Sequence, residues 1–250
     1  MPAPDLAEST TLDASVRPRT ADTQAVLEVE HLEFRHREQA SPALALDRLV
    51  LGRGERLFVH GPSGSGKSTL MSLLAGVRIA DRGRIALLGH DWREVGAGSR
   101  DRRRGDHVGY VFQQFNLLGW LTVLENVCLP CRFSARRATQ AARRSGSIED
   151  DARQWLDALA IRPEYWSRPA ATLSVGEQQR VAAARALIGE PELLLADEPS
   201  SALDSDRRDA FMTMLLDACT QSGSALVFVS HDRSLRGHFE RSLALGGQTS

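Results

Sequence analysis

The sequence contains almost no lysine. Its 250 residues include 31 lysine and arginine residues, and all of them except Lys67 are arginine. A guanidinium is a planar fork of donors, whereas an ammonium is a compact point charge, so the two are not interchangeable in a tight binding site. The composition therefore marks position 67 as one that requires a compact cation.

Other absences exclude whole classes of protein. No apolar run approaches the roughly 18 residues of a membrane span, and the start MPAPDLAEST has neither the charged nor the apolar region of a signal peptide. A net charge of -1 provides no basic surface of the kind that holds a protein on nucleic acid. We therefore expect a cytoplasmic protein that binds no nucleic acid.

The three cysteines are an odd number, which disfavours a disulfide framework. Cys128 and Cys131 form a CxxC pair, a spacing that also occurs in redox and metal sites. No second pair follows, and both cysteines continue the apolar pattern of Leu121, Leu124 and Val127. We predict that they pack in the core.

The apolar pattern divides the chain into a tail and one large domain. Residues 1–25 mix Pro, Ala, Asp, Ser and Thr without periodicity, which predicts a flexible tail, and the domain extends over 26–250. Strands are predicted at 26–34, 43–51, 56–60, 84–89, 107–112, 192–197 and 224–230. Helices are predicted within 147–161, 181–187 and 205–221. This order predicts an α/β sheet interrupted by a helical subdomain at about 115–190.

The stretch Gly61–Ser68 matches GxxxxGK[ST], the pattern of a phosphate-binding loop. It lies between the predicted strand 56–60 and the helical sequence STLMSLLAG, as such a loop requires. Glycines let successive backbone N–H groups surround a phosphate chain, and the helix N-terminus adds its positive end. Lys67 can then reach the β- and γ-phosphates. The alternative, a Gly-rich surface turn, does not explain this spacing.

Two adjacent carboxylates follow another apolar strand. The sequence LLLADEPSSALDS delivers Asp197 and Glu198 to the C-terminal end of this strand, where ligands bind in open α/β sheets. Asp197 is suited to hold Mg²⁺ through water, and Glu198 to polarise an attacking water. A solvated acidic turn is the alternative, but the four preceding apolar residues favour a site. His231 follows strand 224–230 and is expected at the same sheet edge.

Further motifs resemble the ATP-binding subunits of ABC transporters. LSVGEQQR (173–180), LLLADEPSSALDS (193–205) and VSHD (229–232) occur in the order of that family, and the resemblance covers about 26–247. Residues 108–130, VGYVFQQFNLLGWLTVLENVCLP, are most similar to the lipoprotein-release, macrolide-export and FtsE-like cell-division group. The resemblance implies a P-loop ABC cassette with a mixed core sheet, an antiparallel β subdomain and an inserted α-helical subdomain.

The resemblance also implies a role for each motif residue in an ATP site. It implies that Glu198 is the catalytic base, assisted by Lys67, Gln113 and His231. It implies that Mg²⁺ is held by Ser68, Gln113 and Asp197. ATP would contact the adenine-stacking position His36, the Walker A residues Gly61, Pro62, Ser63, Gly64, Ser65, Gly66, Lys67, Ser68 and Thr69, the signature residues Ser174, Gly176 and Glu177, and Asp204 of the D-loop. The signature would close the site from a second subunit.

Two positions depart from the family pattern. His36 occupies a position that is usually Tyr, and its smaller ring should stack more weakly on adenine. Val175 and Glu177 replace Gly and Gln in the usual LSGGQ. Ser174 and Glu177 fit the S-x-x-E capping box, so we predict that Ser174 caps the helix that continues into VAAARAL.

The leading hypothesis is an ATPase subunit that forms a homodimer beneath a separately encoded membrane permease. Such a protein would be peripheral on the cytoplasmic face of the inner membrane. The alternatives are a soluble ABC ATPase of DNA repair or translation, an FtsE-like cell-division signalling ATPase, and a phosphate-loop kinase. The first usually has a coiled-coil insertion or a second cassette, which this sequence lacks, and LSVGEQQR argues against a kinase.

Arginines gather in two further groups. They are Arg100, Arg102, Arg103 and Arg104, and Arg132, Arg136, Arg137, Arg143 and Arg144. Such runs are most often solvated faces, and we predict that here. The alternative is contact with acidic lipid headgroups or with a membrane partner.

The single lysine makes the phosphate loop directly testable. An amine-reactive reagent should modify only the N-terminus and Lys67, and Mg-ATP should protect Lys67 because phosphate contact encloses the ammonium. Peptide mass spectrometry measures both. Equal labelling of Lys67 with and without nucleotide would contradict the phosphate contact.

Overall fold

The structure, a computed structural model, describes residues 25–35, 42–201 and 203–246. His36 and all of the predicted tail except its last residue lie outside the described residues. No helix in the described ranges combines the length and the apolar character that crossing a bilayer requires.

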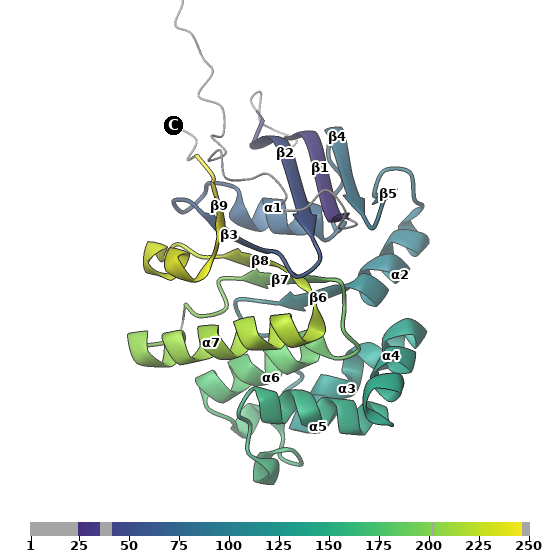
Figure 1. The fold of residues 1–250 in the computed structure, drawn as a ribbon, viewed down its shortest axis with the longest axis vertical. Helices are drawn as coiled ribbons and strands as arrows, with labels where there is room; N and C mark the ends of the chain where they lie inside the picture. The colour runs from purple at the N-terminus through teal and green to yellow at the C-terminus, as the bar shows by residue number, and fades with distance from the viewer. Residues whose placement is uncertain (1–24, 36–41, 202, 247–250) are drawn as a thin grey trace, which may run out of the picture.

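The strands form two sheets, one with antiparallel pairs and one with parallel pairs. One sheet contains, in spatial order, β2 (Leu44–Gly52), β1 (Ala25–Phe34), β4 (Arg82–Leu87) and β5 (His90–Asp91), and its pairs are antiparallel. The other contains β6 (Val108–Val111), β7 (Leu193–Asp197), β8 (Ala225–Val229), β3 (Arg56–His60) and β9 (Arg241–Ala244), and its pairs are parallel. Figure 1 shows the antiparallel sheet above the parallel one.

The parallel sheet separates two apolar cores. Successive side chains of a strand point to opposite faces, and in β3 Leu57 and Val59 join one core while Phe58 joins the other. The central strands β7 and β8 show the same alternation, with every residue of β8 buried. Because both faces are covered, these strands have continuous apolar sequences rather than alternating ones.

Helices cover the two faces of the parallel sheet unequally. Helix α1 (Lys67–Leu74) lies between the two sheets, and its buried leucines pack into the core that they share. The opposite face is covered by α6 (Val175–Leu187) and α7 (Ser205–Ser222). Further helices are α2 (Ala97–His107), α3 (Val123–Phe133), α4 (Ala135–Ser145) and α5 (Ile148–Ala158), with short 3-10 helices η1 (Pro163–Tyr165), η2 (Ala170–Thr172) and η3 (Arg233–His238).

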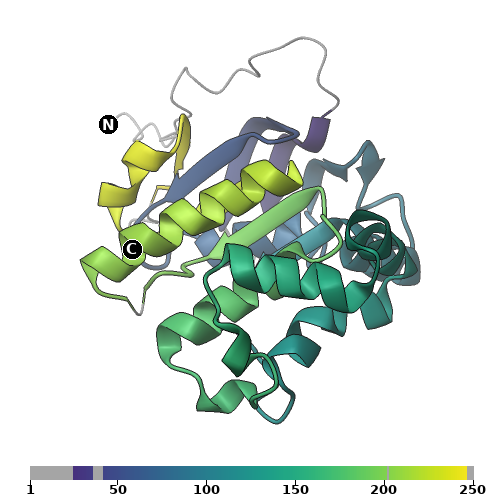
Figure 2. The same ribbon diagram turned by 60° about the horizontal axis from the view of Figure 1, so that its bottom comes forward.

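Figure 2 shows α3 to α6 gathered into one block beside the sheet. The predicted α/β fold with an antiparallel part and an inserted helical part is therefore confirmed. The sequence gives no signal for α2, because its 11 residues include no buried side chain and so carry no apolar periodicity. Helix α3 lies inside the predicted helical subdomain; it contains Pro130, and Thr122 and Glu125 form a capping box at its start.

The cysteines pack as predicted. Cys128 and Cys131 are buried in the apolar core of the helical block and form no disulfide. Burial raises the pKa of Cys128 to about 12 and that of Cys131 to about 11. Because the thiolate is the reactive form, both are inert apolar side chains near neutral pH.

The prediction that the arginines form solvated faces is wrong for several of them. Arg137 is only 3% exposed and donates to the carbonyls of Ala186 (2.6 Å) and Ile188 (2.8 Å), so it caps the C-terminus of α6. Arg144 pairs with the buried carboxylate of Asp151 at 2.6 Å. These guanidiniums thus connect α4 to α6 and to α5 inside the helical block.

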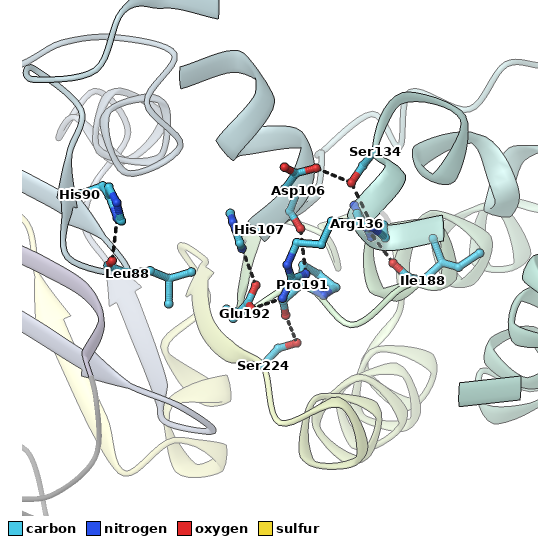
Figure 3. Close-up of polar contacts among 11 residues, drawn as sticks. Leu88, His90, Asp106, His107, Ser134, Arg136, Ile188, Pro191, Glu192 and Ser224 are labelled. Atoms are coloured by element: carbon cyan, nitrogen blue, oxygen red, sulfur yellow. Dashed lines mark hydrogen bonds and ion pairs between the residues drawn. The ribbon is translucent and has the colours of Figure 1, made fainter. Parts of the chain in front are cut away.

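A polar cluster joins the helical block to the parallel sheet (Figure 3). Arg136 of α4 pairs with Glu192, which lies just before β7, and His107 Nδ1 lies 2.9 Å from the same carboxylate. The Ser134 hydroxyl donates to Asp106 at 2.5 Å. The cluster therefore ties the start of α4 to the two strands that begin beside it, β6 and β7.

Candidate functional site

The predicted phosphate loop connects β3 to α1. Gly64 and Gly66 have φ values of 80° and 88°, a left-handed backbone that glycine adopts without strain. At Gly61 a Cβ would lie 2.5 Å from Ser65 Oγ and 2.6 Å from the Leu245 carbonyl oxygen. Glycine is therefore required at Gly61 by close packing, and at the other two positions by backbone conformation.

Lys67 folds back into this loop. Its ammonium donates to the carbonyls of Gly61 and Pro62, both at 2.9 Å, and the side chain is 8% exposed. The ammonium also lies 3.9 Å from Glu198 Oε1. Two loop carbonyls and the Glu198 carboxylate thus surround a compact cation, a geometry that the larger guanidinium fork does not match.

Asp197 ends β7 beside the phosphate loop. It lines one pocket together with Lys67 and Ser68. Burial, and then the adjacent charge of Glu198, raise the pKa of Asp197, while the polar side chains of Ser68 and Tyr110 and the charge of Lys67 oppose that rise. The structure therefore brings the predicted residues Ser68, Lys67 and Asp197 together.

Glu198 lies between Lys67 and His231. Its Oε2 is 2.9 Å from His231 Nδ1, and its backbone N–H donates to the Val229 carbonyl at 2.9 Å. Its φ of 44° places it in the left-handed region, which is uncommon for a residue other than glycine. The backbone at the end of β7 thus turns this carboxylate into the space in front of the phosphate loop.

These elements border a pocket of about 510 Å³. Its lining residues are Ala43, Ser63, Gly64, Gly66, Lys67, Ser68, Thr69, Gln113, Asp197 and Glu198. Gln113 therefore reaches the site from the segment after β6. Ser174, Gly176, Glu177 and Asp204 do not line this pocket within the described chain.

The predicted capping box at the start of α6 is confirmed. The Glu177 backbone N–H donates to Ser174 Oγ at 3.4 Å, and Glu177 Oε2 accepts from the Ser174 backbone N–H at 2.8 Å. Burial alone would raise the pKa of Glu177, but the Ser174 hydrogen bonds lower it. Glu177, the residue that departs from the family pattern, thus helps to cap α6. Asp204 similarly caps α7 by accepting from the Arg207 N–H at 3.0 Å.

Two residues near the site have no signal in the sequence. Tyr110 of β6 stacks on Phe112, the residue before Gln113, and Arg185 near the end of α6 donates to the carbonyls of Phe115 (2.5 Å) and Asn116 (2.7 Å). Phe115 and Asn116 both have positive φ, so Arg185 holds a strained turn just after Gln113. The sequence around Tyr110 and Arg185 gives no signal of these contacts, because the two residues lie within an ordinary strand pattern and an ordinary helix pattern.

A glycine loop, an enclosed ammonium and strand-end carboxylates thus share one pocket at the edge of a parallel sheet. This combination defines the class of phosphate-loop nucleoside triphosphatases.

Comparison with known proteins specifies the family. Residues 47–201 match the model of the ABC transporter family. The uncharacterized ABC transporter ATP-binding protein YbbA of Escherichia coli K12 is 38% identical over 222 residues, covering 88% of this chain and 94% of YbbA. The lipoprotein-releasing system ATP-binding protein LolD of Shewanella frigidimarina is 34% identical, covering 89% of this chain and 90% of LolD.

A solved structure gives the same result. A dimeric, post-hydrolysis structure of the ATP-binding cassette MJ0796 bound to ADP and Pi is 30% identical, with a TM-score of 0.76, and the match covers 89% of this chain and 97% of that chain. The chain therefore belongs to the ABC transporter family. It is an ATP-binding ATPase subunit, as the sequence predicts.

The signature position can be tested with two variants. Val175→Gly should change ATP turnover by less than about threefold, because Val175 is 49% exposed and a β-branched residue costs only tenths of a kcal/mol at a helix start. Gly176→Val should abolish turnover, because a side chain there blocks close approach of a phosphate to the helix N-terminus.

Gly176→Val should still fold and bind ATP as a monomer. Among the described residues, a Cβ at Gly176 would approach only Leu203 Cδ2, at 3.7 Å, which is ordinary contact. Steady-state turnover and calorimetry separate the two effects. A large rise in turnover for Val175→Gly would show instead that the natural signature is degenerate.

Proposed function

We propose that this protein binds Mg-ATP between two copies of itself and uses its hydrolysis to drive a separately encoded membrane permease. The observation that carries the proposal is the Glu198 carboxylate, held between Lys67 and His231 in front of the phosphate loop. The assembly would lie peripherally on the cytoplasmic face of the inner membrane.

The residues present fit a magnesium ion. Ser68, Gln113 and Asp197 all offer side-chain oxygen atoms and line the same pocket. The described residues contain no group of three His, Cys, Asp or Glu that could hold a metal alone. This suits Mg²⁺, which binds one or two carboxylates together with substrate phosphates and water. When bound, Mg²⁺ would neutralise charge on the β- and γ-phosphates.

Glu198 is placed to act as the general base. Its carboxylate can accept a proton from a water in the pocket, and the hydrogen-bonded His231 restricts its orientation. Lys67 would exchange its contacts with the loop carbonyls of Gly61 and Pro62 for phosphate oxygens. Each of the three groups would then interact with the γ-phosphate or with the water that attacks it.

A second subunit completes the site. Ser174 and Gly176 do not line the chain's own pocket, yet the first turn of α6 offers backbone N–H groups suited to an anion. Val175 is half exposed, and little of this chain approaches Gly176. The related cassette MJ0796 is dimeric, which supports the same arrangement here.

Glu198→Gln tests this mechanism. Turnover should fall at least about a hundredfold, the contribution of a general base, while ATP affinity stays within a few-fold. The ATP-bound variant should then accumulate as a dimer in size-exclusion chromatography with light scattering. Glu94→Gln, at an exposed position outside the pocket, is the matched control. A Glu198→Gln protein that turns over normally would refute the base assignment.

An apolar groove is the proposed contact for the permease. It has a volume of about 490 Å³ and lies where α1 ends, between α2, β6 and α3. Phe133 is 81% exposed, and Val77 and Phe112 contribute further exposed apolar surface. Exposed apolar surface of this kind marks an interaction site. The relative LolD is the ATP-binding protein of a lipoprotein-releasing system, which supports an assembly of this chain with a further component.

Phe133→Ser should reduce membrane co-fractionation in cells that contain the native partner, because it removes the largest exposed anchor of the groove. Trp120→Ser is the matched control, since Trp120 is 78% exposed but does not line the groove. Quantitative immunoblotting of membrane and soluble fractions measures the effect. Equal membrane fractions for wild type and Phe133→Ser would exclude the groove as the contact.

A further inference from the structure

The backbone turns sharply just after Gln113. Gln113 follows β6 and lines the pocket in front of the phosphate loop. Two residues further on, Phe115 and Asn116 have φ values of 57° and 50°, in the left-handed region that residues with a Cβ seldom adopt. The Phe115 side chain is buried in the core of the helical block. The position of Gln113 therefore depends on what holds this turn.

One guanidinium holds the turn. Arg185, in the last turn of α6, donates to the Phe115 carbonyl at 2.5 Å and to the Asn116 carbonyl at 2.7 Å. Arg185 is only 9% exposed, and both acceptors belong to the residues with positive φ. Because a charged donor forms stronger hydrogen bonds than a neutral one, these two bonds offset the strain of the turn.

Asn126 of α3 holds the other side of the same segment. It is fully buried, and its Oδ1 accepts from the Leu118 backbone N–H at 2.9 Å. Its Nδ2 donates to the carbonyls of Leu118 and Thr122, both at 3.0 Å. Two buried side chains of the helical block thus hold residues 115–118. Gln113 is exposed and lies two residues before this segment.

Packing alone does not explain an arginine at position 185. The surrounding sequence of α6, VAAARAL, is otherwise apolar, and residues 181–187 are all buried. A methionine would fill a similar space without the free-energy cost of burying a charge. The acceptors of the guanidinium are backbone carbonyls of the turn rather than a carboxylate. The distinctive contribution of Arg185 is therefore the geometry of the segment that follows Gln113.

We propose that Arg185 is a positioning residue for ATP hydrolysis: it fixes the turn at residues 115 and 116 to α6 and so sets the direction in which Gln113 enters the pocket. This inference rests on the proposed function, which assigns Gln113 to the Mg²⁺ site. Without the guanidinium, two carbonyls lose their donor and the strained turn relaxes toward other conformations. Gln113 then samples several positions, while the phosphate loop, built on β3 and α1, keeps its affinity for ATP.

Kinetics test this role with Arg185→Met and the control Arg144→Met. Arg144 also belongs to the helical block, but it pairs with Asp151 of α5 rather than with the turn. For Arg185→Met, kcat should fall about ten- to hundredfold because Gln113 is misplaced, while the Kd for ATP stays within about threefold. Arg144→Met should lower the thermal stability, because it leaves a buried carboxylate unpaired, but keep kcat within about threefold of wild type.

A double variant shows whether Arg185 acts through Gln113. Gln113→Ala should itself lower kcat, and adding Arg185→Met should lower it by less than about twofold more, because both changes disable the same group. Independent effects would multiply instead. Arg185→Lys should lower kcat by about three- to tenfold, because one ammonium cannot hold both carbonyls as the fork does, and this variant serves if Arg185→Met does not fold.

A spectroscopic measurement follows the segment without turnover. Gln114 is exposed, whereas all three native cysteines are buried, so a trifluoromethyl thiol reagent should label Gln114→Cys selectively. In EDTA and without nucleotide, the labelled protein should give one narrow ¹⁹F signal. Adding Arg185→Met or Arg185→Lys should broaden or split this signal, because the turn samples several conformations. Adding Arg144→Met should leave the signal unchanged.

Two outcomes would overturn the inference. One is a folded Arg185→Met or Arg185→Lys protein with the kcat of wild type. The other is a fall in kcat that multiplies with that of Gln113→Ala while the ¹⁹F signal stays single and narrow, which would assign Arg185 a purely structural role. Failure of the proposed function would look different, because Gln113→Ala itself would then leave turnover unchanged while Arg185→Met still broadened the ¹⁹F signal.

Discussion

The site depends on one electrostatic arrangement, a single enclosed ammonium that faces two adjacent carboxylates. Lys67 is held by the carbonyls of its own loop and points toward Glu198, while Asp197 lines the same pocket. Partial burial strengthens these interactions, because the effective dielectric constant is lower than in water. The ammonium and the two carboxylates thus face one space, where the nucleotide phosphates and the proposed Mg²⁺ would balance their charges.

The parallel sheet determines this arrangement. Strands β3, β7 and β8 are central, and their C-terminal ends meet because parallel strands share one direction. Asp197 pairs with Val229 at the last position of that register, so the segments after β7 and β8 bring Glu198 and His231 within 2.9 Å. The two cores on either face fix the register, since a one-residue shift would reverse the facing of every side chain.

The sequence predicted the parts whose physics is local. The phosphate loop needs glycine at fixed offsets, the central strands need continuous apolar residues, and Ser174 with Glu177 forms a capping box, so all three left clear patterns. It did not predict contacts made by long polar side chains across the fold. Arg137 caps α6 from α4, and Arg185 holds the turn at Phe115 from the C-terminal end of α6. Neither contact can be read from a fixed spacing of residues in the sequence, because each joins segments that only folding brings together.

The backbone of Glu198 has a consequence for how this protein balances stability against activity. Its left-handed φ of 44° precedes Pro199, and a conformation of this kind in a residue with a Cβ costs about 1–3 kcal/mol. Glycine would relieve that strain but would remove the carboxylate. Under the proposed mechanism, selection for a more stable fold and selection for ATP hydrolysis therefore act in opposite directions on the same residue. The strain at position 198 is a standing thermodynamic cost that the two buried cores must offset for the carboxylate to face the phosphate loop.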